Sequence, residues 1–156
     1  MLVRLMEKND RNRLMEVVAS AGNFNSDEMN IAMELIDEFL EDPKGSGYIV
    51  QVLQEEEELH GYVCYGPVPL TETTYDLYWI AVRSACRGKG YGQALIRAAE
   101  DDVQKRGGKL LLIETSSLES YQPATRFYKH AGYELIGRIT DFYRQGDDKL
   151  TFAKRL

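Results

Sequence analysis

A turn rich in glycine follows the most strand-like segment of the chain. Residues Tyr75–Val82 are almost all aromatic or β-branched, a composition typical of a central strand. Glycines at alternate positions between 88 and 92 come next, and apolar residues then recur at helical spacing until Gly107 and Gly108. A strand that enters a helix through such a turn can hold a phosphate group, because small residues let backbone N–H groups approach it and the helix end carries roughly half a positive charge.

This glycine turn, Arg87–Gly92, fits neither of the two common nucleotide-binding motifs. The P-loop has Lys and then Ser or Thr after its last glycine, whereas Gln93 and Ala94 follow here. The dinucleotide fingerprint G-x-G-x-x-G also fails, because Gln93 stands where its third glycine belongs. The turn therefore predicts a phosphate-bearing ligand of another kind.

The charges of the chain are divided between two regions. The formal net charge of −6, from 19 basic and 25 acidic residues, opposes binding to nucleic acid. Residues Leu77–Ala99, the cationic strip, contain no acidic residue and four basic ones, which are Arg83, Arg87, Lys89 and Arg97. Residues Asn25–His60 contain eleven acidic residues and one basic residue. We therefore expect an anionic ligand at the glycine turn and a cationic partner, such as an ammonium group, at the acidic region.

Length, cysteine usage and hydropathy exclude several other classes. At 156 residues the chain has the size of one domain, since a single core is typically built from about 100–200 residues, and we expect one domain over residues 1–156. Two cysteines and two histidines occur without the spacing of a structural zinc site or a disulfide framework, so no metal is predicted. No apolar run approaches the ~18–20 residues of a membrane span. We expect a cytoplasmic protein that binds neither nucleic acid nor a membrane.

The remaining pattern predicts an α/β fold with a mixed, mostly antiparallel central sheet flanked by helices on both faces. Expected strands are Leu2–Met6, Tyr48–Leu53, Leu59–Tyr65, Tyr75–Val82, Lys109–Ile113, Tyr133–Tyr143 and Leu150–Leu156. One helix is expected from an N-cap at Ser26, a second after the glycine turn, and a third from Pro123 through Ala131. Residues Glu7–Arg13 are interpreted as a polar segment after the first strand.

Two segments resemble the GCN5-related N-acetyltransferase (GNAT) family. The glycine turn, RGKGYG, is similar to the family signature Q/R-x-x-G-x-G/A. Residues Ala124–Tyr133, ATRFYKHAGY, are similar to the downstream segment A-x-x-F-Y-x-x-x-G-F/Y. Both occur in the family's order, joined by a helix and a strand of suitable length, and the resemblance covers about residues 75–156.

The resemblance implies acetyl-CoA as the acetyl donor. Its pyrophosphate would lie on the backbone amides of Arg87, Gly88, Lys89, Gly90, Tyr91 and Gly92, and its pantetheine arm along the backbone of Ile80, Ala81 and Val82. In the family this fourth strand carries a bulge and splays from the next strand, which leaves a slot for the arm and an N–H that polarises the thioester carbonyl. At Tyr121 many relatives have an asparagine that binds the arm, so that contact is not carried over.

The reaction also needs a base and an acid. An amine of pKa about 10.4 lies roughly 4.6 kcal/mol from its neutral form at pH 7, so a base acting directly or through water is useful. By resemblance, Asp76 is the candidate base and Tyr78 the alternative, with Glu114 and Glu119 as spare carboxylates. Tyr128 matches the family tyrosine that protonates the departing CoA thiolate and contacts the cofactor.

The acceptor is not specified by any motif. Residues Asp141–Asp148 resemble the hairpin of protein N-terminal acetyltransferases, so Tyr143 is a candidate acceptor contact. Tyr78, on the expected fourth strand, is a second candidate acceptor contact. The leading hypothesis is N-acetylation of a primary amine on a small molecule or peptide by direct attack in a ternary complex. The alternatives are a protein N-terminal or lysine acetyltransferase and, in another class, a non-catalytic acyl-CoA-binding module. A covalent acetyl-enzyme on Cys86 is not expected, and a homodimer stays open.

Overall fold

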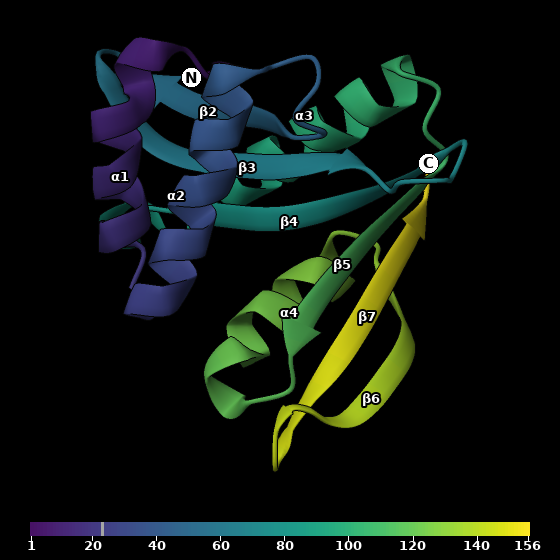
Figure 1. Ribbon diagram of the computed structural model, residues 1–156. Coiled ribbons are helices and arrows are strands. Elements are labelled where there is room, and N and C mark those ends of the chain that lie inside the picture. Colours follow the sequence, from purple (N-terminus) through teal and green to yellow (C-terminus); the bar gives the residue numbers. More distant parts are fainter. Residues whose placement is uncertain (23) are drawn as a thin grey trace.

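The computed structural model describes residues 1–22 and 24–156, which form one seven-stranded mixed sheet with helices on both of its faces (Figure 1). The strand order is β1-β2-β3-β4-β5-β7-β6, and β4 and β5 are the parallel pair among otherwise antiparallel neighbours. The strands are β1 Leu2–Leu5, β2 Ile49–Glu55, β3 Glu58–Pro67, β4 Thr74–Val82, β5 Leu110–Ser116, β6 Glu134–Arg144 and β7 Asp147–Arg155. The predicted fold class is confirmed.

The helices divide between two apolar cores. Helices α1 (Arg11–Ser20) and α2 (Ser26–Glu41) pack with Val50, Val52 and Tyr62 on one face. Helices α3 (Tyr91–Lys105) and α4 (Gln122–His130) pack with Leu77, Leu111 and Phe152 on the other. Figure 1 shows α1 and α2 in front of β2–β4 and α3 behind them. Among the described helices, none is both long and apolar enough to cross a membrane.

A bulge in β4 changes which side chains face each core. Cys64 pairs with Trp79 and Tyr65 pairs with Leu77, so Tyr78 is an extra residue on β4. Strict alternation would place Leu77 and Trp79 on the same face. Because of the bulge, Leu77 shares its core with Ile80, while Trp79 packs in the core of α1 and α2.

One helix was not predicted, and one cap was misplaced. No helix was expected between the first strand and Ser26, but α1 begins in the polar segment Glu7–Arg13, and its buried Leu14, Val17 and Val18 recur at helical spacing. The N-cap of α2 is Asn25 rather than Ser26, because the Asn25 side chain accepts a hydrogen bond from the Glu28 N–H at 2.8 Å.

The other elements lie where the sequence predicts them, within a few residues at each end. The largest extensions are of three residues, at the end of β5, which runs to Ser116 rather than Ile113, and at the start of β7, which begins at Asp147 rather than Leu150. The β6–β7 turn is therefore the tight Gln145–Gly146 pair. Three short 3-10 helices complete the described structure, at Lys8–Asp10, Ser84–Cys86 and Glu119–Tyr121, and the last of these is η3.

Candidate active site

A cavity of about 620 Å³ lies where β4 and β5 separate. The two strands pair in parallel from Thr74 and Leu110 as far as Leu77 and Ile113, and their remaining residues pair only with β3 and β7, respectively. Figure 1 shows the two strands diverging from a shared origin near the C-terminus. The cavity is lined by Phe24, Asn25, Asp27, Glu28, Ile31, Leu35, Asp76, Leu77, Tyr78, Trp79, Ile80, Glu114, Thr115, Ser116, Tyr121, Ala124, Tyr128, Tyr143, Arg144 and Asp147.

The separation leaves one edge of β4 without a strand partner. Within the described residues, Ile80, Ala81 and Val82 pair with Val63, Tyr62 and Gly61 of β3 on one side only. Backbone N–H and C=O groups on the other side are therefore open to an extended ligand. Both features that the resemblance implies, the bulge and the splayed strands, are present.

The glycine turn presents backbone rather than side chains at the start of α3. Gly88 and Gly90 have φ angles of 77° and 82°, the left-handed region that favours glycine, and Gly90 is the N-cap of α3. The Arg87 guanidinium donates to the carbonyl of Ala21, and the Tyr91 hydroxyl donates to Glu55. These two side chains are directed to other elements, and the first N–H groups of α3 have no partner within the helix, a geometry that can hold an anion.

The cationic strip serves partly to hold this turn in place. Arg83 donates from Nε to the carbonyl of Leu59 at 2.7 Å, and its Nη2 lies 3.6 Å from Glu16. Lys89 and Arg97 are exposed to solvent. The strip therefore combines structural contacts with a positive field around the turn.

The comparisons with known proteins agree with this geometry. The sequence model of the Acetyltransferase (GNAT) family matches residues 13–133. The chain belongs to the GNAT acetyltransferase family. It is accordingly an acetyl-CoA-dependent acyltransferase, and no curated protein sequence matches it.

Solved structures share the whole fold of this GNAT enzyme. A Desulfovibrio desulfuricans protein assigned to the GNAT family is 40% identical, with a TM-score of 0.95, over 99% of this chain and 98% of that one. An aminoglycoside 6'-N-acetyltransferase in complex with coenzyme A is 17% identical, with a TM-score of 0.76, over 99% and 97%. The Escherichia coli ribosomal-protein-S18-alanine N-acetyltransferase is 19% identical, with a TM-score of 0.77, over 99% and 92%. The last two comparisons show a shared fold alone.

Tyr128 of the GNAT enzyme is buried with its hydroxyl on the cavity. Its side chain lies among the rings of Phe127, Tyr133 and Phe152, at centroid distances of 5.7, 6.4 and 6.1 Å. No partner for its hydroxyl occurs among residues 1–22 and 24–156. Burial raises the pKa of Tyr128 to about 12, so the phenol is neutral and able to donate a proton at pH 7.

Asp76 and Tyr78 line the same cavity from β4, as the sequence predicts. Burial, and then the negative charge of Glu114, raise the pKa of Asp76 above its ordinary value. Burial and the neighbouring Asp76 raise the pKa of Tyr78 to about 12, and its ring meets that of Tyr48 edge to face at 5.4 Å. Asp76 is therefore a half-buried carboxylate held close to a second carboxylate, an arrangement suited to a base.

The other predicted residues divide between the cavity and its surroundings. Tyr143 lines the cavity, and so does Glu114, which lies 3.5 Å from Lys149. Glu119 is in η3 and is not among the cavity-lining residues, so it is the least suitable of the spare carboxylates. Cys86 lies outside the lining too, with its Sγ 3.4 Å from Nδ1 of His60.

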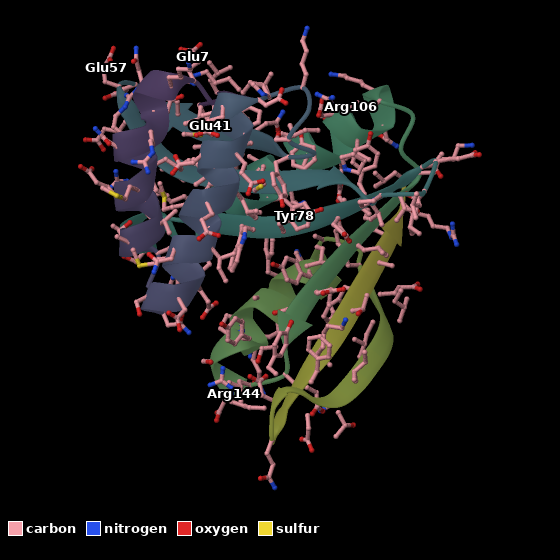
Figure 2. All side chains as sticks on the ribbon, in the orientation of Figure 1. Glu7, Glu41, Glu57, Tyr78, Arg106 and Arg144 are labelled. Atoms are coloured by element: carbon pink, nitrogen blue, oxygen red, sulfur yellow. The ribbon has the colours of Figure 1, made fainter. Side chains whose placement is uncertain are left out.

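Sequence reasoning missed the wall that α2 contributes. Asp27 and Glu28, in the first turn of α2, line the cavity, and Glu28 accepts a hydrogen bond from the Tyr121 hydroxyl at 3.0 Å. Figure 2 shows Tyr78 on β4 and Arg144 at the end of β6, on the two sides of the divergence that the cavity occupies. The acidic composition of residues 25–60 predicted a cationic partner in this region, but it did not identify which acidic residues line the cavity.

Proposed function

We propose that this GNAT enzyme transfers the acetyl group of acetyl-CoA to a primary amine of a small molecule or a peptide, within one catalytic domain that spans residues 1–156. The observation that carries the proposal is the position of Tyr128, whose buried side chain lines one cavity with Asp76 beside the open edge of β4. A candidate acid, Tyr128, and a candidate base, Asp76, thus line the same cavity, as direct attack in a ternary complex requires.

The donor would lie along β4 and the glycine turn. The unpaired edge of Ile80–Val82 would hold the pantetheine arm, and the amides of Arg87–Gly92 would hold the pyrophosphate. Bound in this way, acetyl-CoA supplies a thioester as the activated acyl group. An N–H on the open edge of β4 would stabilise the negative charge that develops on the thioester oxygen.

Asp76 would accept the proton that the incoming ammonium must lose. Burial and the charge of Glu114 raise the pKa of Asp76, which makes it a stronger base than an ordinary aspartate. Tyr78 and Glu114 line the same cavity and are the alternative routes, directly or through a water molecule. The neutral nitrogen then attacks the carbonyl carbon.

Tyr128 would protonate the CoA thiolate as it leaves. As the tetrahedral intermediate collapses, the C–S bond breaks and its electron pair goes to sulfur. The Tyr128 phenol then gives its proton to the thiolate and is reprotonated, directly or through water, by the second proton that the acceptor nitrogen loses. Free CoA and the neutral amide leave, and the proton on Asp76 returns to solvent. The unpartnered state of the Tyr128 hydroxyl among the described residues supports this role.

A second candidate is acetylation of a protein N-terminus. The β6–β7 hairpin contributes Tyr143, Arg144 and Asp147 to the cavity, so a groove for an extended chain is available. The similarity to a ribosomal-protein-S18-alanine N-acetyltransferase points the same way, and the similarity to aminoglycoside 6'-N-acetyltransferases favours a small molecule.

An acceptor screen tests the proposal. The protein is incubated with acetyl-CoA and panels of small amines, amino sugars and N-terminal peptides, while free thiol and the mass of each acceptor are recorded. We expect thiol release matched by acetylation of one acceptor class. Binding of CoA without thiol release in any panel would support a non-catalytic acyl-CoA-binding module instead.

A further inference from the structure

The cavity carries more negative charge than one acceptor ammonium needs. Five carboxylates line it, those of Asp27, Glu28, Asp76, Glu114 and Asp147, against the single guanidinium of Arg144. Burial and the charges of Glu114, Asp147 and Glu28, in that order, raise the pKa of Tyr143, which shows that these groups act on one region of space. The surplus charge favours a cationic ligand.

Only part of this charge is compensated within the protein. Asp147 accepts a hydrogen bond from Ser116 and lies 3.6 Å from Arg144, and Glu114 lies 3.5 Å from Lys149. No Lys, Arg or His in the described ranges forms an ion pair with Asp27, Glu28 or Asp76. The three uncompensated carboxylates are therefore the ones that a ligand could satisfy.

These three carboxylates lie at two separate places. Asp76 is on β4 beside the bulge, and Asp27 and Glu28 are in the first turn of α2. In the part of the chain that the structure describes, no three His, Cys, Asp or Glu side chains are grouped closely enough to hold a metal ion. A ligand with two ammonium groups could pair with one carboxylate at each place.

Glu28 can bind a ligand while keeping its structural contacts. Its Oε1 completes the α2 cap at 3.5 Å from the Asn25 N–H, and its Oε2 accepts the Tyr121 hydroxyl. Both donors are neutral, so they leave the charge of Glu28 uncompensated, and a carboxylate has about four lone-pair positions. The aromatic rings of Phe24 and Trp79, whose centroids are 5.1 Å apart, also line the cavity and offer apolar surface for methylene groups.

We propose that the acceptor is a dicationic small molecule, in which one amino group is acetylated at Asp76 while a second ammonium group is held by Glu28. This inference rests on the proposed N-acetyltransferase activity and names its substrate class. An apolar spacer between the two amino groups would lie against the aromatic wall. Peptides with a single α-amino group would lack the second contact.

Matched acceptors test this inference directly. A series of α,ω-diaminoalkanes is compared with the alkyl monoamines of equal length, and kcat/KM is measured by thiol release from acetyl-CoA. A charge-assisted hydrogen bond contributes about 1.5–3 kcal/mol, so we expect at least a tenfold preference for diamines of the fitting length. Equal kcat/KM values for the two series would overturn the inference and leave the proposed function intact. The absence of thiol release with every amine would instead count against the proposed function.

Two variants test whether Glu28 is the residue that holds the second ammonium group. Glu28→Gln removes the charge, keeps one amide oxygen for the cap of α2, and can donate from its NH2 group to the Tyr121 hydroxyl oxygen. Glu34→Gln makes the same change at an exposed position of α2 outside the cavity lining. We expect Glu28→Gln to reduce the ratio of diamine to monoamine kcat/KM about tenfold, mainly through KM, and Glu34→Gln to preserve that ratio. An unchanged ratio in Glu28→Gln would reject the assignment.

Ionic strength provides an independent measurement on the unmodified enzyme, should Glu28→Gln fold poorly. Salt screens charge pairs that are partly exposed. We therefore expect kcat/KM for the preferred diamine to fall more steeply with salt than kcat/KM for its matched monoamine. Parallel salt dependences would contradict a second ionic contact.

Discussion

The proposed donor and acceptor sides of the cleft are built in different ways. The donor side, residues Ile80–Gly92, is one continuous segment that offers backbone groups from a strand edge and a helix N-terminus. The acceptor side is made of side chains from α2, η3 and the β6–β7 hairpin, which are far apart in the sequence. A binding site made of backbone groups requires one particular conformation over a short run of residues. A binding site made of side chains can be altered by substituting one residue at a time.

The two sides also differ in charge. The donor side lies in the cationic strip, and the acceptor side carries the uncompensated Asp27 and Glu28. In the proposed function, a polyanionic cofactor and a cationic acceptor would thereby be directed to different walls of one cleft. Tyr128 and Asp76 lie where the two sides meet, so changes there should have the largest effects.

Tyr128→Phe should produce the largest loss of activity. Removing a general acid typically costs about 10²-fold or more, so we expect kcat to fall by about 10²-fold while the dissociation constant of CoA changes little. Steady-state thiol release gives kcat, and calorimetric titration with CoA gives the affinity.

Tyr133→Phe is the matched control for this variant. It removes a hydroxyl from the neighbouring ring, which donates to Glu100 at 2.9 Å and is outside the cavity lining. We expect a lower melting temperature and a kcat close to that of the parent. Equal losses of kcat in the two variants would mean that Tyr128 acts through packing.

Asp76→Asn should have the next largest effect, about a tenfold loss of kcat/KM for the acceptor near neutral pH. Because the pKa of Asp76 is raised above its ordinary value of 3.8, activity should rise with pH through that higher pKa in the parent enzyme. The variant should lack this acidic limb. A pH profile of kcat/KM that keeps the limb in Asp76→Asn would assign it to another group, with Glu114 the first candidate.

The same substitution should act on stability in the opposite direction. A carboxyl group with a raised folded-state pKa loses stability as pH rises from its ordinary value through the raised one, because the folded state retains the proton longer. Asp76→Asn should therefore melt at a higher temperature than the parent at neutral pH. Asp10 provides the contrast, since hydrogen bonding to Arg4 lowers its pKa, and its contribution is present above 3.8 and lost on acidification below that value. Asp10→Asn should melt lower.

The sequence predicted the donor side better than the acceptor side, for physical reasons. The glycine turn and Tyr128 belong to local motifs, and the strands around them follow from runs of β-branched and aromatic residues. The contact between Glu28 and Tyr121 joins residues that are 93 positions apart in the sequence. A local sequence pattern does not predict a contact between residues so far apart in the chain. The start of α1 was missed because charged residues at 11 and 13 hid the apolar spacing that begins at Leu14. The capping role of Asn25 was assigned one residue too late, because Ser26 is an equally good capping type.

Gly90→Ala should weaken the donor side selectively. No atom lies within 4 Å of a Cβ at this position, so the cost is the left-handed backbone at φ 82°, about 1–2 kcal/mol. If the turn relaxes to avoid this cost, KM for acetyl-CoA should rise about fivefold while KM for the acceptor stays constant. Gly107→Ala carries the same kind of strain at φ 86° at the other end of α3, and it should lower stability without changing either KM. A matching rise in acceptor KM in Gly90→Ala would show that the two sides are not independent.

Tyr121→Phe should have the smallest effect, and it should be confined to the acceptor side. The hydroxyl of Tyr121 joins η3 to α2 through Glu28, and a hydrogen bond contributes about 0.5–1.5 kcal/mol net. We expect KM for the acceptor to rise about threefold and KM for acetyl-CoA to stay constant, because the side-chain hydrogen bonds described for the glycine turn are to Ala21 and Glu55. Since many relatives have an asparagine at this position that binds the pantetheine arm, a rise in KM for acetyl-CoA instead would mean that Tyr121 has kept a donor role despite its bond to α2. Separate titrations of the two substrates distinguish these outcomes.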